Sequence, residues 1–176
     1  MKKNGFVAPI IVLTAICFVV AALLGYINSI TDPIITEANI KAAEEAKKEV
    51  LPEADSFTDL DTDSLPEEVV SAAAADNGAG NVFILDGAGY GGTMEIIVGI
   101  NADGQVEGTK VLAHSETAGL GARVADEKFT SKFLGVGEDD LDGVELISGS
   151  TISSKCFRGL VAKAFEANDT LAKEGN

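Results

Sequence analysis

The sequence predicts an α+β protein: a single N-terminal transmembrane helix, followed by a domain of antiparallel strands with flanking helices. Three observations lead to this prediction. An uncharged apolar run lies near the N-terminus, short β-patterned segments joined by tight turns occupy residues 82–113, and a long amphipathic segment covers residues 152–171. Strands that follow one another through tight turns favour an α+β domain over a repeated βαβ arrangement.

The apolar run at residues 6–27 predicts the transmembrane helix. Only Pro9 and Thr14 interrupt its apolar character, and about 20 helical residues cross the hydrocarbon core of a bilayer. A cleaved signal peptide is the alternative, but its apolar core has only about 7–15 residues and ends in a small-x-small site, which is absent here. Because Lys2 and Lys3 precede the run, we expect a cytoplasmic stub and an extracytoplasmic domain.

Residues 32–80 are predicted to connect the anchor of residues 1–31 to the domain. Asp32-Pro33 is expected to break the chain, and residues 37–51 to form a solvated helix that acts as a spacer. An acidic, turn-rich stretch follows, and residues 67–75 are predicted to form a short helix. The loop DNGAG at residues 76–80 marks the expected boundary, so that the domain comprises residues 81–176.

Charge and composition exclude several classes of function. The chain has 28 acidic and 13 basic residues and a net charge of −15, and every acidic residue lies after Thr31. A surface this acidic repels phosphate backbones, which excludes nucleic acid as a partner. Cys17 and Cys156 lie far apart and the chain has one histidine, so neither a disulfide framework nor a cysteine or histidine metal site is expected. The acidic runs at residues 59–63 and 138–142 lack the spacing of a calcium loop and are interpreted as solvated loops.

Within the domain, the pattern predicts three strands and a helix. The strands are expected at residues 82–85, 93–100 and 105–113, and the turn NADG at residues 101–104 joins the last two as a hairpin. Residues 152–171 place apolar side chains on one face at helical spacing, which predicts a helix packed against the strands.

A glycine-rich segment, GAGYGG at residues 87–92, superficially matches a dinucleotide-binding loop. That mechanism requires a helix N-terminus directly after the glycines. The segment that follows, TMEIIVGI, is β-patterned instead, so this interpretation fails. Two interpretations remain open: a flexible hairpin loop, or a loop whose bare backbone approaches a flat ligand.

The segment SGSTISS at residues 148–154, directly before the amphipathic helix, is the strongest indication of a ligand site. Free amides and the positive end of the helix dipole make a helix N-terminus suitable for an anion. An ordinary N-cap needs only one hydroxyl, and this segment contains several. A phosphate bound there would lie beside the Thr151 hydroxyl.

A second polar segment, HSETAGLG at residues 114–121, follows a predicted strand. A polar turn joined to a Gly-Leu-Gly bend is uncommon as a mere connection. A lone histidine at the end of a strand is more typical of a structural residue than of a catalytic one, so the segment is a binding candidate through its other residues.

Three segments together resemble those of a membrane flavoprotein family. VELISGSTISS resembles the flavinylation motif of that family, HSETAGLG resembles its H-x-E-T-P-G-L-G segment, and GYGGTMEIIVGINADGQVEGTKVL resembles its glycine loop and hairpin. The family comprises the FMN-binding subunits of the Rnf complex (its G subunit) and of the sodium-translocating NADH:quinone reductase (its C subunit). The compact length is more similar to the Rnf protein. The chain departs from the family pattern at Ser150, Glu145 and Ala118, which replace alanine, aspartate and proline.

The resemblance implies that residues 81–176 bind FMN, joined through its phosphate to the Thr151 hydroxyl by a separate flavin transferase. It implies no catalytic or metal-binding residue. The chain would be a non-autonomous electron-transfer subunit of an ion-translocating ferredoxin–NAD oxidoreductase, a single-pass protein of the cell membrane, with the other membrane subunits and lipid as partners. The motifs nominate these cofactor-binding residues: Thr151, Ser148, Gly149, Ser150, Glu116, Thr117, Leu120 and Tyr90.

Two alternatives to this function stay open at the level of sequence. The first is the C subunit of a sodium-translocating NADH:quinone reductase. The second is a membrane-anchored binding module without redox function, in which SGSTISS serves only as a helix cap.

Overall fold

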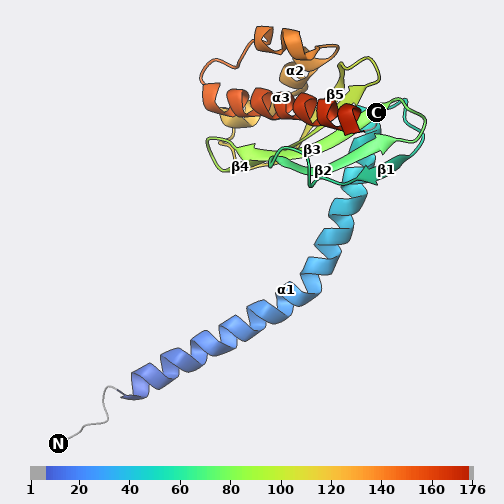
Figure 1. The fold of residues 1–176 in the computed structure, drawn as a ribbon. Helices are drawn as coiled ribbons and strands as arrows, with labels where there is room; N and C mark the ends of the chain where they lie inside the picture. Colours follow the sequence, from blue (N-terminus) through green and yellow to red (C-terminus); the bar gives the residue numbers. More distant parts are fainter. Residues whose placement is uncertain (1–6, 175–176) are drawn as a thin grey trace, which may run out of the picture. The chain divides into compact units, whose positions relative to one another are not determined.

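The computed structural model describes residues 7–174 (Figure 1). The chain divides into two compact units, Met1–Ala43 and Glu44–Asn176, which we describe separately. The expected cytoplasmic stub with Lys2 and Lys3 lies outside the described residues.

Helix α1 spans Val7–Val50 and contains the predicted transmembrane segment from Val7 to residue 27; residue 6 lies outside the described residues. Its stretch Pro9–Ser29 is long and apolar enough to cross a membrane, and none of it is buried within the protein. The break expected at Asp32-Pro33 is wrong, because the helix continues through both residues. A proline inside a helix removes one backbone hydrogen bond, and the long runs of helix on either side retain theirs.

The second unit is built on a five-stranded antiparallel sheet (Figure 1). Each strand pairs with the next one along the chain, in the order β1-β2-β3-β4-β5. The three predicted strands are confirmed as β3, β4 and β5, and their hairpin turn is closed by the Gly104 N–H, which donates to the Asn101 oxygen at 2.9 Å. The strands are β1 (Phe57–Leu60), β2 (Val69–Ala75), β3 (Gly80–Ala88), β4 (Thr93–Asn101) and β5 (Val106–His114).

The first two strands were not predicted. The helix expected at residues 67–75 is wrong, because Val69–Ala75 pairs with β1 on one side and with β3 on the other. Its alanines favour a helix locally, but Ala72 and Ala73 are fully covered in the sheet, and this packing outweighs intrinsic propensity. The boundary expected between residues 80 and 81 therefore falls within β3, inside the sheet, and the compact unit begins at Glu44.

One face of the sheet is covered by α3 (Thr151–Glu174), which confirms the predicted helix and packs on β3 and β4. Phe157 of α3 meets Phe129 and Phe133, with ring centroids 5.0–5.3 Å apart. These two phenylalanines come from short helices that the sequence did not predict. The short helices are η1 (Gly121–Ala125), α2 (Glu127–Thr130), η2 (Ser131–Phe133) and η3 (Glu138–Gly143).

The last turns of α1 pack on the opposite face of the sheet. A Cβ on Gly99 would lie 2.4 Å from the Val50 oxygen, and a Cβ on Gly108 would lie 2.6 Å from the Val50 Cα, so the two glycines admit the helix end. Lys47 is buried and donates to Glu44 at 2.9 Å and to Asp59 at 3.0 Å. Burial lowers the pKa of Lys47, but these two carboxylates outweigh it and raise the pKa above the ordinary value. The end of the expected spacer helix is thus part of the folded unit rather than fully solvated.

Candidate functional site

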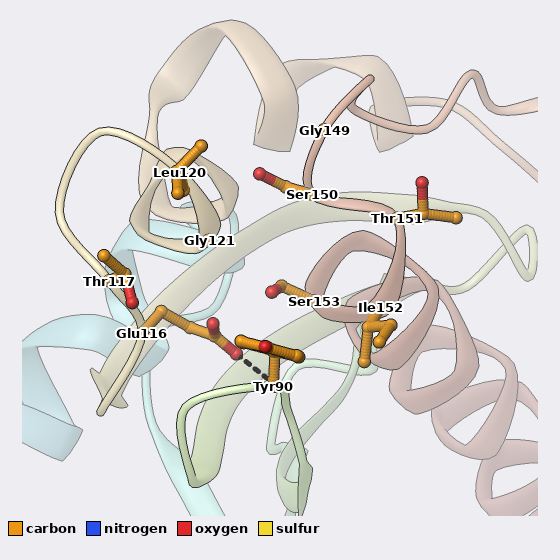
Figure 2. Close-up of a pocket in the computed structure, with 10 residues that line it drawn as sticks. All are labelled: Tyr90, Glu116, Thr117, Leu120, Gly121, Gly149, Ser150, Thr151, Ile152 and Ser153. Carbon is orange, nitrogen blue, oxygen red and sulfur yellow. Dashed lines mark hydrogen bonds between the residues drawn. The ribbon is translucent and has the colours of Figure 1, made fainter.

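A cavity of about 400 Å³ opens where three segments of the second unit meet (Figure 2). They are the glycine loop between β3 and β4, the polar segment after β5, and the N-terminus of α3. Cofactor sites generally have volumes of about 300–1,000 Å³, so the cavity has the size of a small-molecule site. Its lining residues are Tyr90, Glu116, Thr117, Leu120, Gly121, Gly149, Ser150, Thr151, Ile152 and Ser153.

All but one of the residues nominated from the sequence line this cavity. The exception is Ser148, which lines a neighbouring cavity together with Arg123 and Lys132. Gly149, the next residue, lines the first cavity, and its φ of +81° turns the backbone so that Ser148 faces the second. Glycine adopts this conformation without the steric cost that a Cβ would add.

Sequence reasoning missed Gly121, Ile152 and Ser153 as lining residues. Gly121 ends the Gly-Leu-Gly bend, and a Cβ there would lie 2.1 Å from Glu116 Oε2. Ile152 and Ser153 follow Thr151 in the first turn of α3. The signal that could have identified them is their position in that first turn, because residues around a helix N-terminus surround any group held there.

The turn before α3 places Thr151 at the cavity. The Ser150 N–H donates to the Ile147 oxygen at 3.0 Å, which closes the turn around Gly149. Ser154 Oγ donates to the Ser150 oxygen at 2.8 Å and accepts from the Ile147 N–H at 3.3 Å. Thr151 itself is exposed and begins the helix, so its side chain is open to solvent.

The N-terminus of α3 favours an anion electrostatically. The first amides of a helix have no acceptor within the helix, and the helix dipole places partial positive charge at this end. Ser150 directly precedes the helix, and its Oγ is buried and has no hydrogen-bond partner among the described residues. A buried hydroxyl without a partner is costly, and a ligand oxygen would satisfy it.

Glu116 forms the opposite wall of the cavity. Its Oε1 accepts a hydrogen bond from the Tyr90 N–H at 2.7 Å, and its own N–H donates to His114 Nδ1 at 3.2 Å. Its Oε2 is buried and without a partner in the part of the chain that the structure describes. The site therefore offers an unused acceptor to a ligand that carries an N–H or O–H donor.

Apolar side chains surround the mouth of the cavity. Tyr90 is 73% exposed, Leu120 55% and Ile152 56%, and all three line the cavity. Large apolar side chains gathered in this way indicate a surface that another group covers. The combination of an apolar mouth, an anion-binding helix end and a buried acceptor suits a flat ring with a phosphate tail.

The Cys156 thiol lies close enough to Glu116 to sense its charge. Burial raises the pKa of the Cys156 thiol, and the negative charge of Glu116 raises it further, so this thiol is neutral at pH 7. Among the residues whose side chains the structure describes, no group of three or more histidine, cysteine, aspartate or glutamate residues is arranged to hold a metal ion.

Comparison with known proteins matches residues 89–166 to the FMN-binding domain family, and this range contains every lining residue. The chain is 30% identical over 160 residues to the G subunit of the ion-translocating oxidoreductase complex of Methanosarcina acetivorans, covering 83% of this chain and 85% of that protein. It is 28% identical over an alignment of 189 residues to the G subunit of the Na(+)-translocating ferredoxin:NAD(+) oxidoreductase complex of Acetobacterium woodii (93% and 91%). It is 24% identical over 163 residues to the G subunit of the proton-translocating ferredoxin:NAD(+) oxidoreductase complex of Clostridium ljungdahlii (88% and 86%).

Proposed function

The chain belongs to the G-subunit family of ion-translocating oxidoreductase complexes, and from that premise we propose that it is the FMN-bearing electron-transfer subunit of an ion-translocating ferredoxin–NAD oxidoreductase. The observation that carries the proposal is the cavity, which joins the three segments that the sequence nominated separately. The FMN-binding domain family covers the same residues.

The residues of the cavity fit FMN by their chemistry. The free amides of α3 and the unpartnered Ser150 Oγ suit the phosphate. The exposed apolar groups of Leu120, Ile152 and Tyr90 suit the ring system, and Glu116 Oε2 is an acceptor for a ring N–H. Thr117 adds a hydroxyl on the same wall. When bound, FMN supplies reversible electron chemistry, while the protein provides binding, orientation and electrostatics.

Thr151 is the proposed attachment point: the flavin transferase would transfer the FMN phosphoryl group from FAD to the Thr151 hydroxyl. The new phosphoester replaces the pyrophosphate bond of FAD, AMP leaves, and the hydroxyl loses its proton. Gly149 and Ser154 support this assignment, because they set the turn that brings the Thr151 hydroxyl to the free amides. A phosphoester at this position gains charge-assisted hydrogen bonds and a favourable interaction with the helix dipole. A covalent tether also keeps the cofactor from being lost at each turnover.

The remaining residues hold and shield the cofactor. Glu116 is positioned by the His114 imidazole and the Tyr90 amide, so its free oxygen has a fixed location. Its buried negative charge lies beside the site and disfavours additional negative charge there, which tunes the reduction potential. Ser148 lies in the neighbouring cavity, so its role is to shape the turn rather than to contact the ring.

The membrane arrangement is part of the proposal. The stretch Pro9–Ser29 anchors the chain, with the N-terminus cytoplasmic and the second unit extracytoplasmic. The partners are the other membrane subunits of the complex, membrane lipid, and a flavin transferase that installs FMN during maturation. The acidic residues all lie on the extracytoplasmic side in this arrangement.

A denaturing gel tests the flavoprotein proposal simply. Protein produced together with a flavin transferase should give a band that fluoresces under blue light, because a covalent flavin survives denaturation. Protein produced without the transferase should give a dark band. A dark band in both cases would contradict the proposal.

A further inference from the structure

The glycine loop that joins β3 to β4 rests directly on Glu116. The Gly89 N–H donates to the Gly92 oxygen at 2.9 Å and closes the loop on itself. Tyr90 belongs to this closed loop, and its N–H donates a hydrogen bond to Glu116 Oε1, outside the loop, at 2.7 Å (Figure 2). This hydrogen bond joins residues that are 26 positions apart and connects the loop to the wall of the cavity.

The glycines permit this close approach. A Cβ on Gly89 would lie 2.2 Å from Glu116 Oε1, and a Cβ on Gly91 would lie 2.3 Å from the Ser115 oxygen. Neither distance leaves room for a side chain, so the loop can reach Glu116 only as bare backbone. Tyr90 is thus the one residue between Gly89 and Gly92 that presents a side chain, and this side chain lines the cavity while staying 73% exposed.

The two carboxylate oxygens of Glu116 have different environments. Oε1 is occupied by the loop, whereas Oε2 is buried and has no partner among the described residues. Gly121 faces Oε2 from the other side, where a Cβ would lie 2.1 Å away. The carboxylate is therefore enclosed by glycine backbone on both sides, and this enclosure sets its orientation; no ion pair to it is formed among the residues that the structure describes.

We propose that Glu116 is a positioning residue that latches the glycine loop over the cavity. Its Oε1 holds the Tyr90 amide, its Oε2 accepts a ring N–H of the ligand, and the Tyr90 ring then covers the ligand face that is turned to solvent. The inference rests on the proposed function for the identity of the ligand as a flat, N–H-bearing ring. The latch itself is a property of the protein, so it can be tested without the cofactor.

Hydrogen exchange in flavin-free protein tests the latch. In a Thr151→Ala background, Glu116→Ala should speed exchange of the Tyr90 amide about tenfold, since one hydrogen bond is lost. Glu116→Gln keeps an acceptor oxygen and should preserve most of the protection. Gly89→Ala should open the loop as Glu116→Ala does, whereas Gly137→Ala, with open space around its Cβ and no positive φ, should not. Glu53→Ala removes an exposed carboxylate and controls for lost charge.

The latch is overturned by either of two results of this exchange experiment. The first is a Tyr90 amide that exchanges equally fast in the background protein and in Glu116→Ala. The second is a uniform rise in exchange across β3, β4 and β5 in both Glu116→Gln and Gly89→Ala, which would mean that Glu116 only stabilises the fold.

Quenching of the fluorescence of the attached flavin by iodide tests whether the Tyr90 ring covers the flavin. Tyr90→Ala should raise the quenching constant several-fold, because the ring face becomes accessible, and Tyr90→Phe should keep the wild-type value, because the ring remains. A quenching constant in Tyr90→Ala equal to that of the wild-type protein would show that the Tyr90 ring does not cover the flavin. If the wild-type protein carries no flavin, the proposed function fails instead, and the exchange experiment still decides whether the latch exists.

Discussion

The Oγ of Ser154 donates a 2.8 Å hydrogen bond to the main-chain oxygen of Ser150, four residues earlier. The same Oγ accepts a 3.3 Å hydrogen bond from the Ile147 N–H. Ser154 is fully buried, so a side chain of the first helical turns fixes the backbone on both sides of Gly149. The position of Thr151 at the cavity depends on this contact.

Replacing Ser154 with alanine should therefore destabilise the domain and misplace the turn. The Ile147 N–H would lose its partner in a buried position, which costs about 1–3 kcal/mol in the free energy of unfolding. Urea denaturation of the two proteins measures this loss. Thr170→Ala is the matched control, because Thr170 Oγ1 donates to the Glu166 oxygen at 2.9 Å at an exposed position of the same helix. An equal loss in both variants would show that the turn has no special dependence on Ser154.

Gly149→Ala should destabilise the turn through backbone conformation alone. The φ of Gly149 is +81°, and nothing lies within 4 Å of a Cβ built there. The left-handed conformation costs a residue with a Cβ about 1–2 kcal/mol, and the strained turn should also slow attachment of flavin. Gly143→Ala, which has the same open space without a positive φ, should change the free energy of unfolding by less than about 0.5 kcal/mol. Equal effects of the two substitutions would contradict the assigned role of Gly149.

The reactivity of Cys156 should depend on pH and on Glu116. Burial and, second, the Glu116 charge raise the pKa of the thiol, and only the thiolate reacts with alkylating reagents. Alkylation of Cys156, followed by peptide mass spectrometry, should therefore rise at higher pH than for a free cysteine. Glu116→Ala removes the repelling charge and should shift this profile to lower pH, whereas the exposed Glu127→Ala should not. An unchanged profile in Glu116→Ala would show that the two groups do not interact.

The membrane arrangement predicts that protease added to intact cells will cleave the chain after Asp32. The uncharged stretch between Asn4 and Thr31 would remain with the membrane. Immunoblotting of the C-terminal fragment before and after lysis measures the cleavage. Cleavage that occurs only after lysis would reverse the topology, and a mature N-terminus near Tyr26 would show that the anchor is removed.

Local patterning was sufficient for the elements that surround the site. The segments at β3, β4 and β5 are short β-patterned runs bounded by turn residues, α3 has helical periodicity, and the structure confirms all four. The alanines of Val69–Ala75 favour a helix in isolation and so predict one, whereas the observed strand is set by pairing with β1 and β3. The short helices between Gly121 and Gly143 are 3–6 residues long, too short for a periodic pattern to identify.

The sequence predicts which segments form the site, but it does not predict the contacts between them. The hydroxyl-rich turn and the HSETAGLG segment were recognisable because their residue types are unusual for simple connections. The hydrogen bond from the Tyr90 amide to Glu116 could not be foreseen, because it depends on how far a loop of glycines approaches another strand end. Ser148 was expected beside the other hydroxyls, but the positive φ of Gly149 turns the chain so that it lines a different cavity.

The covalent attachment of FMN to Thr151 is the central claim, and the intact mass of the purified protein tests it most directly. After production with a flavin transferase, wild-type protein should carry the mass of one FMN phosphoester, and Thr151→Ala should carry none. Thr151→Ala should still fold and insert in the membrane, because the helix face that contains Phe157 and Val161 is unchanged. Thr151→Ser keeps the hydroxyl and should retain some of the modification. A full adduct on Thr151→Ala would move the attachment to a neighbouring serine, and an unmodified wild-type protein would contradict the flavoprotein account itself.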